Sequence, residues 1–287
     1  MTTVPAPAPI GLDALLKRSW ELFQHNWNVA LPPLLAAIVG LLVFAAVVVV
    51  AVFSAIAHGN PEHWSPGFVM TLVGAYLLFI AFVVVLSLWA NVAMYGMADA
   101  VWARGTTTLG DGMRAFRERG GSALVATIGY VGLTLAALIL ALPTLGLAIL
   151  ALPFVTMYVF PSVVSGGRGG FEAIAESFRL VRNYLGQSII VYLVLYAIAY
   201  GISLLMICAI IPLEFAVIPI GGGPDPAFRA PSIPLAVFSG GVWLVTIGAL
   251  IAYNGFHTIA LVGMYRDLIA QPPRLPAAAA GTAIAQP

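Results

Sequence analysis

The sequence predicts an all-α protein whose polytopic bundle of about six helices crosses a membrane. Of the 287 residues, 61% are hydrophobic and only 8% are charged, and the mean hydropathy is +1.03. A soluble domain carries about 25% charged residues, so this chain has too few charges to cover a water-exposed surface. We expect one transmembrane domain over 10–270, between Pro/Ala-rich disordered tails at 1–9 and 271–287.

Long uncharged intervals define the expected spans. A helix needs about 20 apolar residues to cross the hydrocarbon core. The charged residues leave five long uncharged intervals, 22–61, 63–98, 120–167, 183–213 and 230–265. The third is long enough for two helices joined by a tight turn at 142–146. The expected spans are therefore 30–57, 68–95, 122–142, 144–165, 188–212 and 235–264. A shallow re-entrant hairpin over 122–165 is the competing interpretation, because each arm is only just long enough.

The basic residues indicate the orientation. Eleven of the 12 Lys and Arg residues fall in segments that this topology places on one side, and only Arg229 falls on the other. The positive-inside rule makes that side cytoplasmic, together with both termini. The N-terminus lacks the basic region and cleavable apolar core of a signal peptide. The compact Ala/Val/Leu-rich spans suggest a prokaryotic inner membrane, and the net charge of +1 gives no basic field for nucleic acid.

An amphipathic segment precedes each predicted hairpin and favours a threefold internal repeat. Such helices lie in the headgroup plane with the apolar side down. The expected apolar stripes, in chain order, are Leu12, Leu15, Leu16, Trp20, Phe23 and Trp27; Leu109, Met113 and Phe116; and Phe171, Ile174, Phe178, Val181 and Leu185. Glu172, Glu176, Arg179 and Arg182 are expected opposite the last stripe. Ser19-Trp20-Glu21, Ala115-Phe116-Arg117 and Ser177-Phe178-Arg179 occupy corresponding places.

Two groups of polar residues are candidate sites. Asn91, Asn254 and His257 lie within spans, where an unpaired polar group is costly. They could converge on one polar pocket or merely form hydrogen bonds between helices. Arg114, Arg117, Arg179 and Arg182 lie on the basic side and could contact anionic lipid headgroups, although topology alone also explains their placement.

The sequence contains no recognisable arrangement for catalysis or metal binding. Cys208 is the single cysteine and lies in an apolar run. His58 and His63 share a short outer loop, but Gly59 and Pro61 prevent a common helix face and a third ligand is missing. His257 has no visible carboxylate or thiol partner for acid–base chemistry. We therefore expect no cofactor, no metal and no enzymatic activity.

Two segments resemble a known membrane-protein family. Residues 161–190 (PSVVSGGRGGFEAIAESFRLVRNYLGQSII) combine a span ending in proline, a glycine loop and an amphipathic helix with an Ala…Ser-aromatic-x-Leu core. Together with Leu12–Trp27 they resemble the glycerophosphoryl diester phosphodiesterase membrane-domain family over roughly 10–270. Members often carry an acid before the amphipathic helix, where this chain has Val163–Gly166. The resemblance implies the membrane module alone, because the catalytic barrel and its metal-binding cluster are missing.

Three functions follow as hypotheses. The leading one is a non-enzymatic integral membrane protein with a structural, scaffolding or lipid-associated role and with membrane lipids as partners. The alternative is a transporter or permease for a small or lipid-like substrate, favoured by the repeat and by Asn91, Asn254 and His257. An intramembrane enzyme is the third.

Overall fold

The protein is all-α throughout the part that the structure describes. The computed structural model describes residues 11–58, 65–217 and 233–271, and these form helices and turns without a strand. Some residues discussed above lie outside the described part: both predicted tails except Gln271, and also Arg229 and His63. The side chain of His58 is likewise not described. The α-helices are α1 (Leu12–His25), α2 (Leu31–His58), α3 (Pro66–Arg104), α4 (Leu109–Ala141), α5 (Leu147–Val155), α6 (Val159–Val164), α7 (Gly170–Asn183), α8 (Leu185–Val217) and α9 (Ile233–Ala270). A short 3₁₀ helix, η1 (Trp27–Ala30), joins α1 to α2.

Six candidate membrane spans confirm the predicted fold class. By length and composition they are Trp27–Ser54, Pro66–Arg104, Leu109–Ala141, Leu147–Val164, Leu185–Cys208 and Gly240–Ala270. Their apolar side chains are open to the surroundings, as Phe53 (69% exposed) and Leu78 (74% exposed) show. In water such exposure would cost free energy, whereas in a bilayer these side chains meet lipid tails. The protein is an integral membrane protein.

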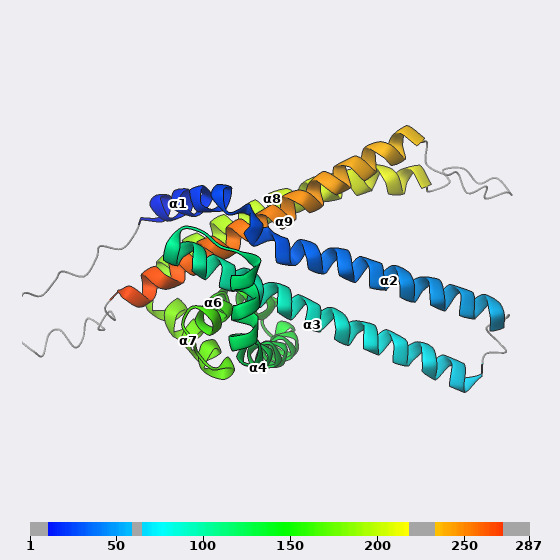
Figure 1. Ribbon diagram of the computed structural model, residues 1–287, viewed down its shortest axis with the longest axis horizontal. Coiled ribbons are helices and arrows are strands. Elements are labelled where there is room, and N and C mark those ends of the chain that lie inside the picture. The colour runs from blue at the N-terminus through cyan, green and yellow to red at the C-terminus, as the bar shows by residue number, and fades with distance from the viewer. Residues whose placement is uncertain (1–10, 59–64, 218–232, 272–287) are drawn as a thin grey trace, which may run out of the picture.

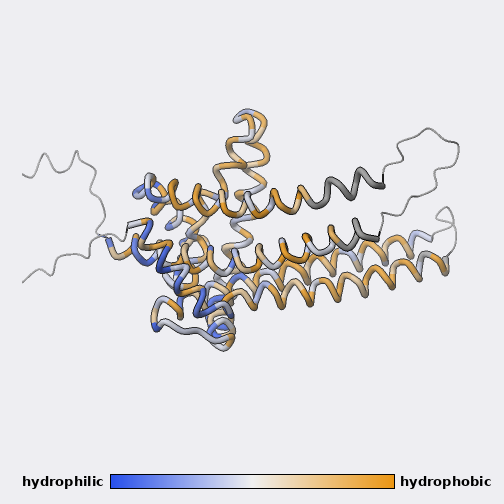
Figure 2. The backbone as a smooth tube through the Cα atoms, turned by 90° about the horizontal axis from the view of Figure 1, so that it is seen from above, coloured by the Kyte–Doolittle hydropathy of each residue, from blue (hydrophilic) through white to orange (hydrophobic). Residues whose placement is uncertain are grey.

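The three hairpins diverge from one compact end of the molecule, which we call the base. The base comprises α1, the last turns of α3 and α9, the start of α4, the 165–169 loop and α7. Figure 1 shows α2–α3 and α8–α9 extending from it as separate pairs. Hydrophilic residues gather at this end, and the hairpins beyond it are apolar (Figure 2). The inner helices α3, α6 and α9 contact one another there, so the base holds the hairpins together.

The α4–α5 hairpin runs across the direction of the other two, as the two views show together (Figures 1 and 2). Its turn lies at the predicted position. Leu145 and Gly146 have positive φ values of 51° and 83°, and the Gly146 amide donates to the carbonyl of Ala141 at 2.7 Å. Gly146 suits this conformation because it has no Cβ to oppose a positive φ.

Prolines accompany an interruption of the fourth span. Helix α5 ends at Val155 and α6 begins at Val159. Pro161 has no amide hydrogen for the carbonyl four residues earlier, so the helical hydrogen-bond pattern breaks close to it. Pro153 lies within α5.

Two expectations about the amphipathic segments need correction. The middle segment is continuous with the span in α4 and does not form a separate interfacial helix. In α7, Phe171 (65% exposed) and Phe178 (41% exposed) face outward, while Glu176 is buried. Glu176 was expected on the polar outer face. Periodicity places residues on a common side of a helix, but α7 packs against α4 and α6, and its buried residues are Gly170, Ala173, Glu176, Ser177, Leu180 and Val181.

Candidate functional site

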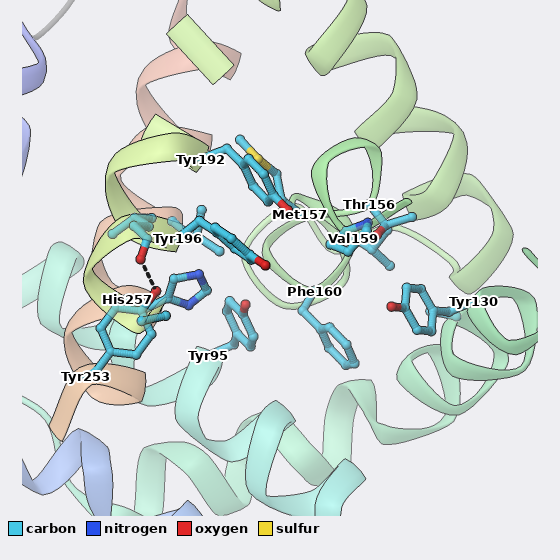
Figure 3. Close-up of a pocket in the computed structure, with 15 residues that line it drawn as sticks. Tyr95, Tyr130, Thr156, Met157, Val159, Phe160, Tyr192, Tyr196, Tyr253 and His257 are labelled. Atoms are coloured by element: carbon cyan, nitrogen blue, oxygen red, sulfur yellow. Dashed lines mark hydrogen bonds between the residues drawn. The ribbon is translucent and has the colours of Figure 1, made fainter. Parts of the chain in front are cut away.

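A cavity lined by aromatic side chains lies among the inner helices, between the base and the diverging hairpins. Its volume is about 350 Å³, within the roughly 300–1,000 Å³ of typical ligand pockets. Side chains from α3, α4, α5, α6, α8 and α9 surround it (Figure 3). The lining residues are Tyr95, Ala126, Tyr130, Pro153, Thr156, Met157, Val159, Phe160, Tyr192, Leu195, Tyr196, Ala199, Tyr253, His257 and Leu261. None of them carries a carboxylate, a lysine or an arginine.

Stacked rings form two walls of this cavity. Tyr95 of α3 stacks on Phe160 of α6, with ring centroids 5.6 Å apart and planes 9° from parallel. On the α8 side, Tyr192 stacks on Tyr196 at 5.7 Å and 21°. Such pairs stabilise packing by about 0.5–1.5 kcal/mol beyond the area they bury. Two aromatic pairs, from different helices, therefore form part of the cavity wall.

Polar groups on the cavity wall are largely without protein partners. The Tyr253 hydroxyl donates to the carbonyl of Leu195 at 2.8 Å. The His257 ring lies 5.5 Å from that of Tyr253 and points into the same space as the hydroxyl ends of Tyr95 and Tyr196 (Figure 3). Within the described part of the chain, these last three groups form no hydrogen bond.

The cavity lies near the basic end of the membrane-embedded region. Arg266 of α9 donates to the Asp99 carboxylate of α3 at 2.7 and 3.0 Å, and this pair marks the base. His257 precedes Arg266 by nine residues, about 13 Å along a helix at 1.5 Å per residue. Tyr95 precedes Asp99 by four residues, about 6 Å. Measured from the base, both therefore lie within about half of the approximately 30 Å thickness of a hydrocarbon core.

The structure separates the predicted polar cluster into two parts. Asn91 and Asn254 line a second cavity of about 580 Å³ between α2, α3 and α9, and His257 does not contribute to it. The Asn91 amide donates to the carbonyl of Ser87 in its own helix at 2.8 Å. Asn254 and His257 are three residues apart on α9, but they line different cavities.

The four predicted headgroup arginines also differ among themselves. Arg114 pairs with Asp111 at 3.3 Å, and Arg179 pairs with Glu176 at 3.2 Å. Arg117 and Arg182 are exposed, and neither forms an ion pair with a described residue. Arg117 and Arg182 are therefore the two of the set whose charges are available to an anionic group.

Sequence reasoning missed a buried acid cluster at the base, centred on Glu176. Its carboxylate accepts hydrogen bonds from the Ser162 hydroxyl and from Arg168 Nε at 3.1 Å, and the Tyr265 hydroxyl lies 3.4 Å away. The charges of Glu176 and Glu172 raise the pKa of the Arg168 guanidinium. This Glu176 cluster links α6, α7 and α9, and its buried charge is compensated by arginines.

The aromatic cavity residues were also missed, although one signal was present. Tyr192, Tyr196 and Tyr200 recur every four residues in α8 and therefore share a helix face. Tyr95, Tyr253 and Phe160 come from three other helices with no common pattern. Their convergence depends on how the hairpins pack, so local sequence does not reveal it.

The cavity wall is apolar, with a few neutral polar groups. Among the described residues, no group of three or more His, Cys, Asp or Glu is placed to hold a metal ion. Cys208 is a free, exposed thiol and does not line the cavity. What the site offers is flat apolar surface with hydroxyl and imidazole groups, surrounded by lipid-facing helices.

Fold and cavity together define a helical integral membrane protein with six candidate membrane-spanning helices. No protein-family model, curated protein or solved structure matches the chain.

Proposed function

We propose that this protein is a non-enzymatic, lipid-associated membrane protein that holds one lipid-like molecule in the aromatic cavity. The observation that carries the proposal is the cavity itself: about 350 Å³, lined by aromatic and aliphatic side chains. Tyr130 and Tyr196 on its wall are 38% and 52% exposed. Because hydrocarbon surrounds these helices, a molecule from the bilayer can reach the cavity without crossing water.

Charge placement supports the same proposal. Arg117 and Arg182 lie at the base without ion pairs to described residues, where they would attract anionic lipid headgroups by about 1 kcal/mol each. The basic end would face the cytoplasm by the positive-inside rule, with both termini on that side of a prokaryotic inner membrane. His257 has no acidic or thiol neighbour on the cavity wall, which supports a role without catalysis.

The fold that we propose for this role is that of the glycerophosphoryl diester phosphodiesterase membrane-domain family. The likeness of residues 161–190 and 12–27 to that family supports it. Only the membrane module is proposed, so the role does not include hydrolysis of glycerophosphodiesters.

A cavity-filling substitution tests the proposal. Ala199 lines the cavity, whereas Ala197 on the same helix is exposed and does not. After purification in native lipid, native mass spectrometry should find one tightly held lipid-like molecule on the natural protein and on Ala197→Phe. Ala199→Phe should lose it. Equal retention by both variants, or no retained molecule on the natural protein, would contradict the proposal.

A permease is the second candidate, and the cavity of about 580 Å³ favours it. Asn91 and Asn254 both line this cavity, and two amides facing one space in a membrane could bind a small polar solute. In a growth-based uptake screen, an Asn91→Ala/Asn254→Ala double variant should lose transport while His257→Ala retains it. Unchanged uptake in the double variant would remove this candidate.

A further inference from the structure

The aromatic cavity contains hydrogen-bond donors that a plain hydrocarbon chain cannot satisfy. The hydroxyls of Tyr95 and Tyr196 and the ring of His257 point into one space (Figure 3), and none is hydrogen-bonded to a described residue. An unpaired hydroxyl in an apolar environment costs about 1–3 kcal/mol in proteins. Either water or a ligand carrying acceptor atoms would remove this cost.

The aromatic pairs on the wall bear on the shape of such a ligand. The Tyr95–Phe160 stack and the Tyr192–Tyr196 stack come from different helices, and both line the cavity. A planar ring gains dispersion and quadrupole interactions against surfaces of this kind, whereas a flexible acyl chain gains only non-directional contact. The walls therefore favour a planar head.

The cavity also has a direction in which a tail can leave. Helix α8 starts at Leu185 in the base, so Tyr192, Tyr196 and Ala199 lie progressively further from it. At 1.5 Å per residue, Ala199 is about 10 Å beyond Tyr192. Beyond Ala199 the side chains of Leu204 and Leu205 are exposed, so an apolar tail passing Ala199 enters hydrocarbon.

From these three features we infer that the cavity binds a planar ring that bears carbonyl oxygens and an apolar tail, the chemistry of an isoprenoid quinone. This inference rests on the proposed function, because it names the class of lipid-like molecule held. The carbonyl oxygens accept from Tyr95, Tyr196 or His257 in its N–H form, and the ring lies against the stacked walls. The absence of charge on the cavity wall matches a head that is neutral.

Two probes separate the acceptor atoms from the rest of the molecule. 2-Decyl-1,4-benzoquinone and decylbenzene share a ring and a tail, but only the first has carbonyl oxygens. Delipidated full-length protein is mixed with each probe in detergent and gel-filtered, and the retained probe is quantified against empty micelles. One hydrogen bond contributes about 0.5–1.5 kcal/mol net, so two should make the quinone bind about five-fold or more tightly than decylbenzene.

Variants on the cavity wall identify the donors. Tyr95→Phe keeps the ring that stacks on Phe160 and removes only the hydroxyl, and His257→Leu removes the imidazole. Each should weaken quinone binding about three- to ten-fold and leave decylbenzene binding unchanged. Tyr200→Phe is the matched control, because Tyr200 stacks on Tyr196 but does not line the cavity. Unchanged decylbenzene retention also shows that the variants remain folded.

The outcomes distinguish this inference from the proposed function. If the quinone binds no more tightly than decylbenzene while Ala199→Phe abolishes retention of both, the quinone inference is overturned and the lipid-binding role stands. The quinone inference is likewise overturned if Tyr95→Phe and His257→Leu bind the quinone like the natural protein. If the natural protein retains neither probe and no native lipid, both fail.

Discussion

At the scale of single residues, the most consequential side chain outside the cavity is Glu176. It is 5% exposed, yet it carries a charge at the junction of α6, α7 and α9. Removing a carboxylate from water is expensive unless hydrogen bonds and opposite charges compensate for it. That compensation comes from Arg168, Arg179 and Ser162. All three interact with the Glu176 carboxylate, so the cluster cannot form without it.

Neutralising Glu176 should destabilise the base. Glu176→Gln keeps the size of the side chain but loses two ion pairs, and Gln offers one acceptor oxygen in place of two. We expect a loss of about 1.5–3 kcal/mol, seen as an apparent melting temperature lower by roughly 3–10 °C in detergent. Scanning fluorimetry of the purified protein measures it.

Glu172→Gln is the matched control for this change. Glu172 pairs with the same Arg168 at 2.9 Å, but its side chain is 60% exposed. An exposed pair contributes less than about 1 kcal/mol, so its melting temperature should stay close to that of the natural protein. Equal effects of the two substitutions would mean that burial of Glu176 does not matter.

At this scale, the sequence could predict which polar residues lie within the spans. It could not predict which neighbouring residues they face. Asn254 and His257 were correctly placed within the membrane region. Three residues separate them, and a spacing of three usually means a shared helix face. The two cavities nevertheless meet α9 on different flanks, and only the packing of neighbouring helices decides which residue faces which cavity. Glu176 was misplaced for the same reason.

At the scale of elements, small residues set the approach of α3 and α4. A Cβ added to Gly112 of α4 would lie 2.9 Å from the carbonyl oxygen of Ala93 in α3 and 3.0 Å from its Cβ. Backbone cannot move aside as a flexible side chain can. Gly112 therefore fixes how closely the second hairpin packs against the first.

Alanine at two glycines of α4 should have opposite effects. Gly112→Ala should destabilise the protein by about 1–3 kcal/mol, because the added methyl group overpacks the contact with Ala93. Nothing lies within 4 Å of a Cβ added to Gly121, so Gly121→Ala should gain about 0.5–1 kcal/mol from helix propensity. Thermal unfolding of both variants tests this, and a shift of the same sign in both would contradict it.

The ion pair between Asp99 and Arg266 joins the ends of α3 and α9. Asp99 lies two residues after the pair Gly96-Met97, and Arg266 lies two residues after the pair Gly263-Met264, so the two partners occupy corresponding positions in a local sequence match between α3 and α9. The repeat itself stays a prediction. The inward position of Ser19 and Ser177, both fully buried, is what a shared plan for α1 and α7 requires.

A double-mutant cycle should find coupling between these two ends. Asp99→Ala and Arg266→Ala should each destabilise the protein, and the double variant should cost less than their sum by about 0.5–3 kcal/mol. The reversed pair Asp99→Arg/Arg266→Asp should recover part of the loss. Additive single effects with no recovery on reversal would show that the pair does not hold α3 against α9.

At the scale of the whole molecule, the sequence predicted the number of spans and the gathering of the basic residues at one end. Uncharged length gave six helices, and the positions of basic residues gave one hydrophilic end, which Figure 2 shows. The direction of each hairpin could not be predicted in this way. Hydropathy reports which residues avoid water, whereas the crossing of α4–α5 relative to α2–α3 depends on contacts such as Gly112 with Ala93 that join distant segments.

The side of the membrane reached by the α4–α5 turn tests the whole topology. With Cys208 replaced by alanine, single cysteines are introduced at Arg117 in the base, at Ser65 before α3 and at Leu142, which is 88% exposed in the turn. A membrane-impermeant maleimide should label Ser65→Cys and Leu142→Cys from one side of oriented vesicles and Arg117→Cys from the other. The reason is that an even number of crossings separates Ser65 from Leu142 and an odd number separates each from Arg117. Labelling of Leu142→Cys together with Arg117→Cys would instead establish the re-entrant hairpin and reduce the spans to four.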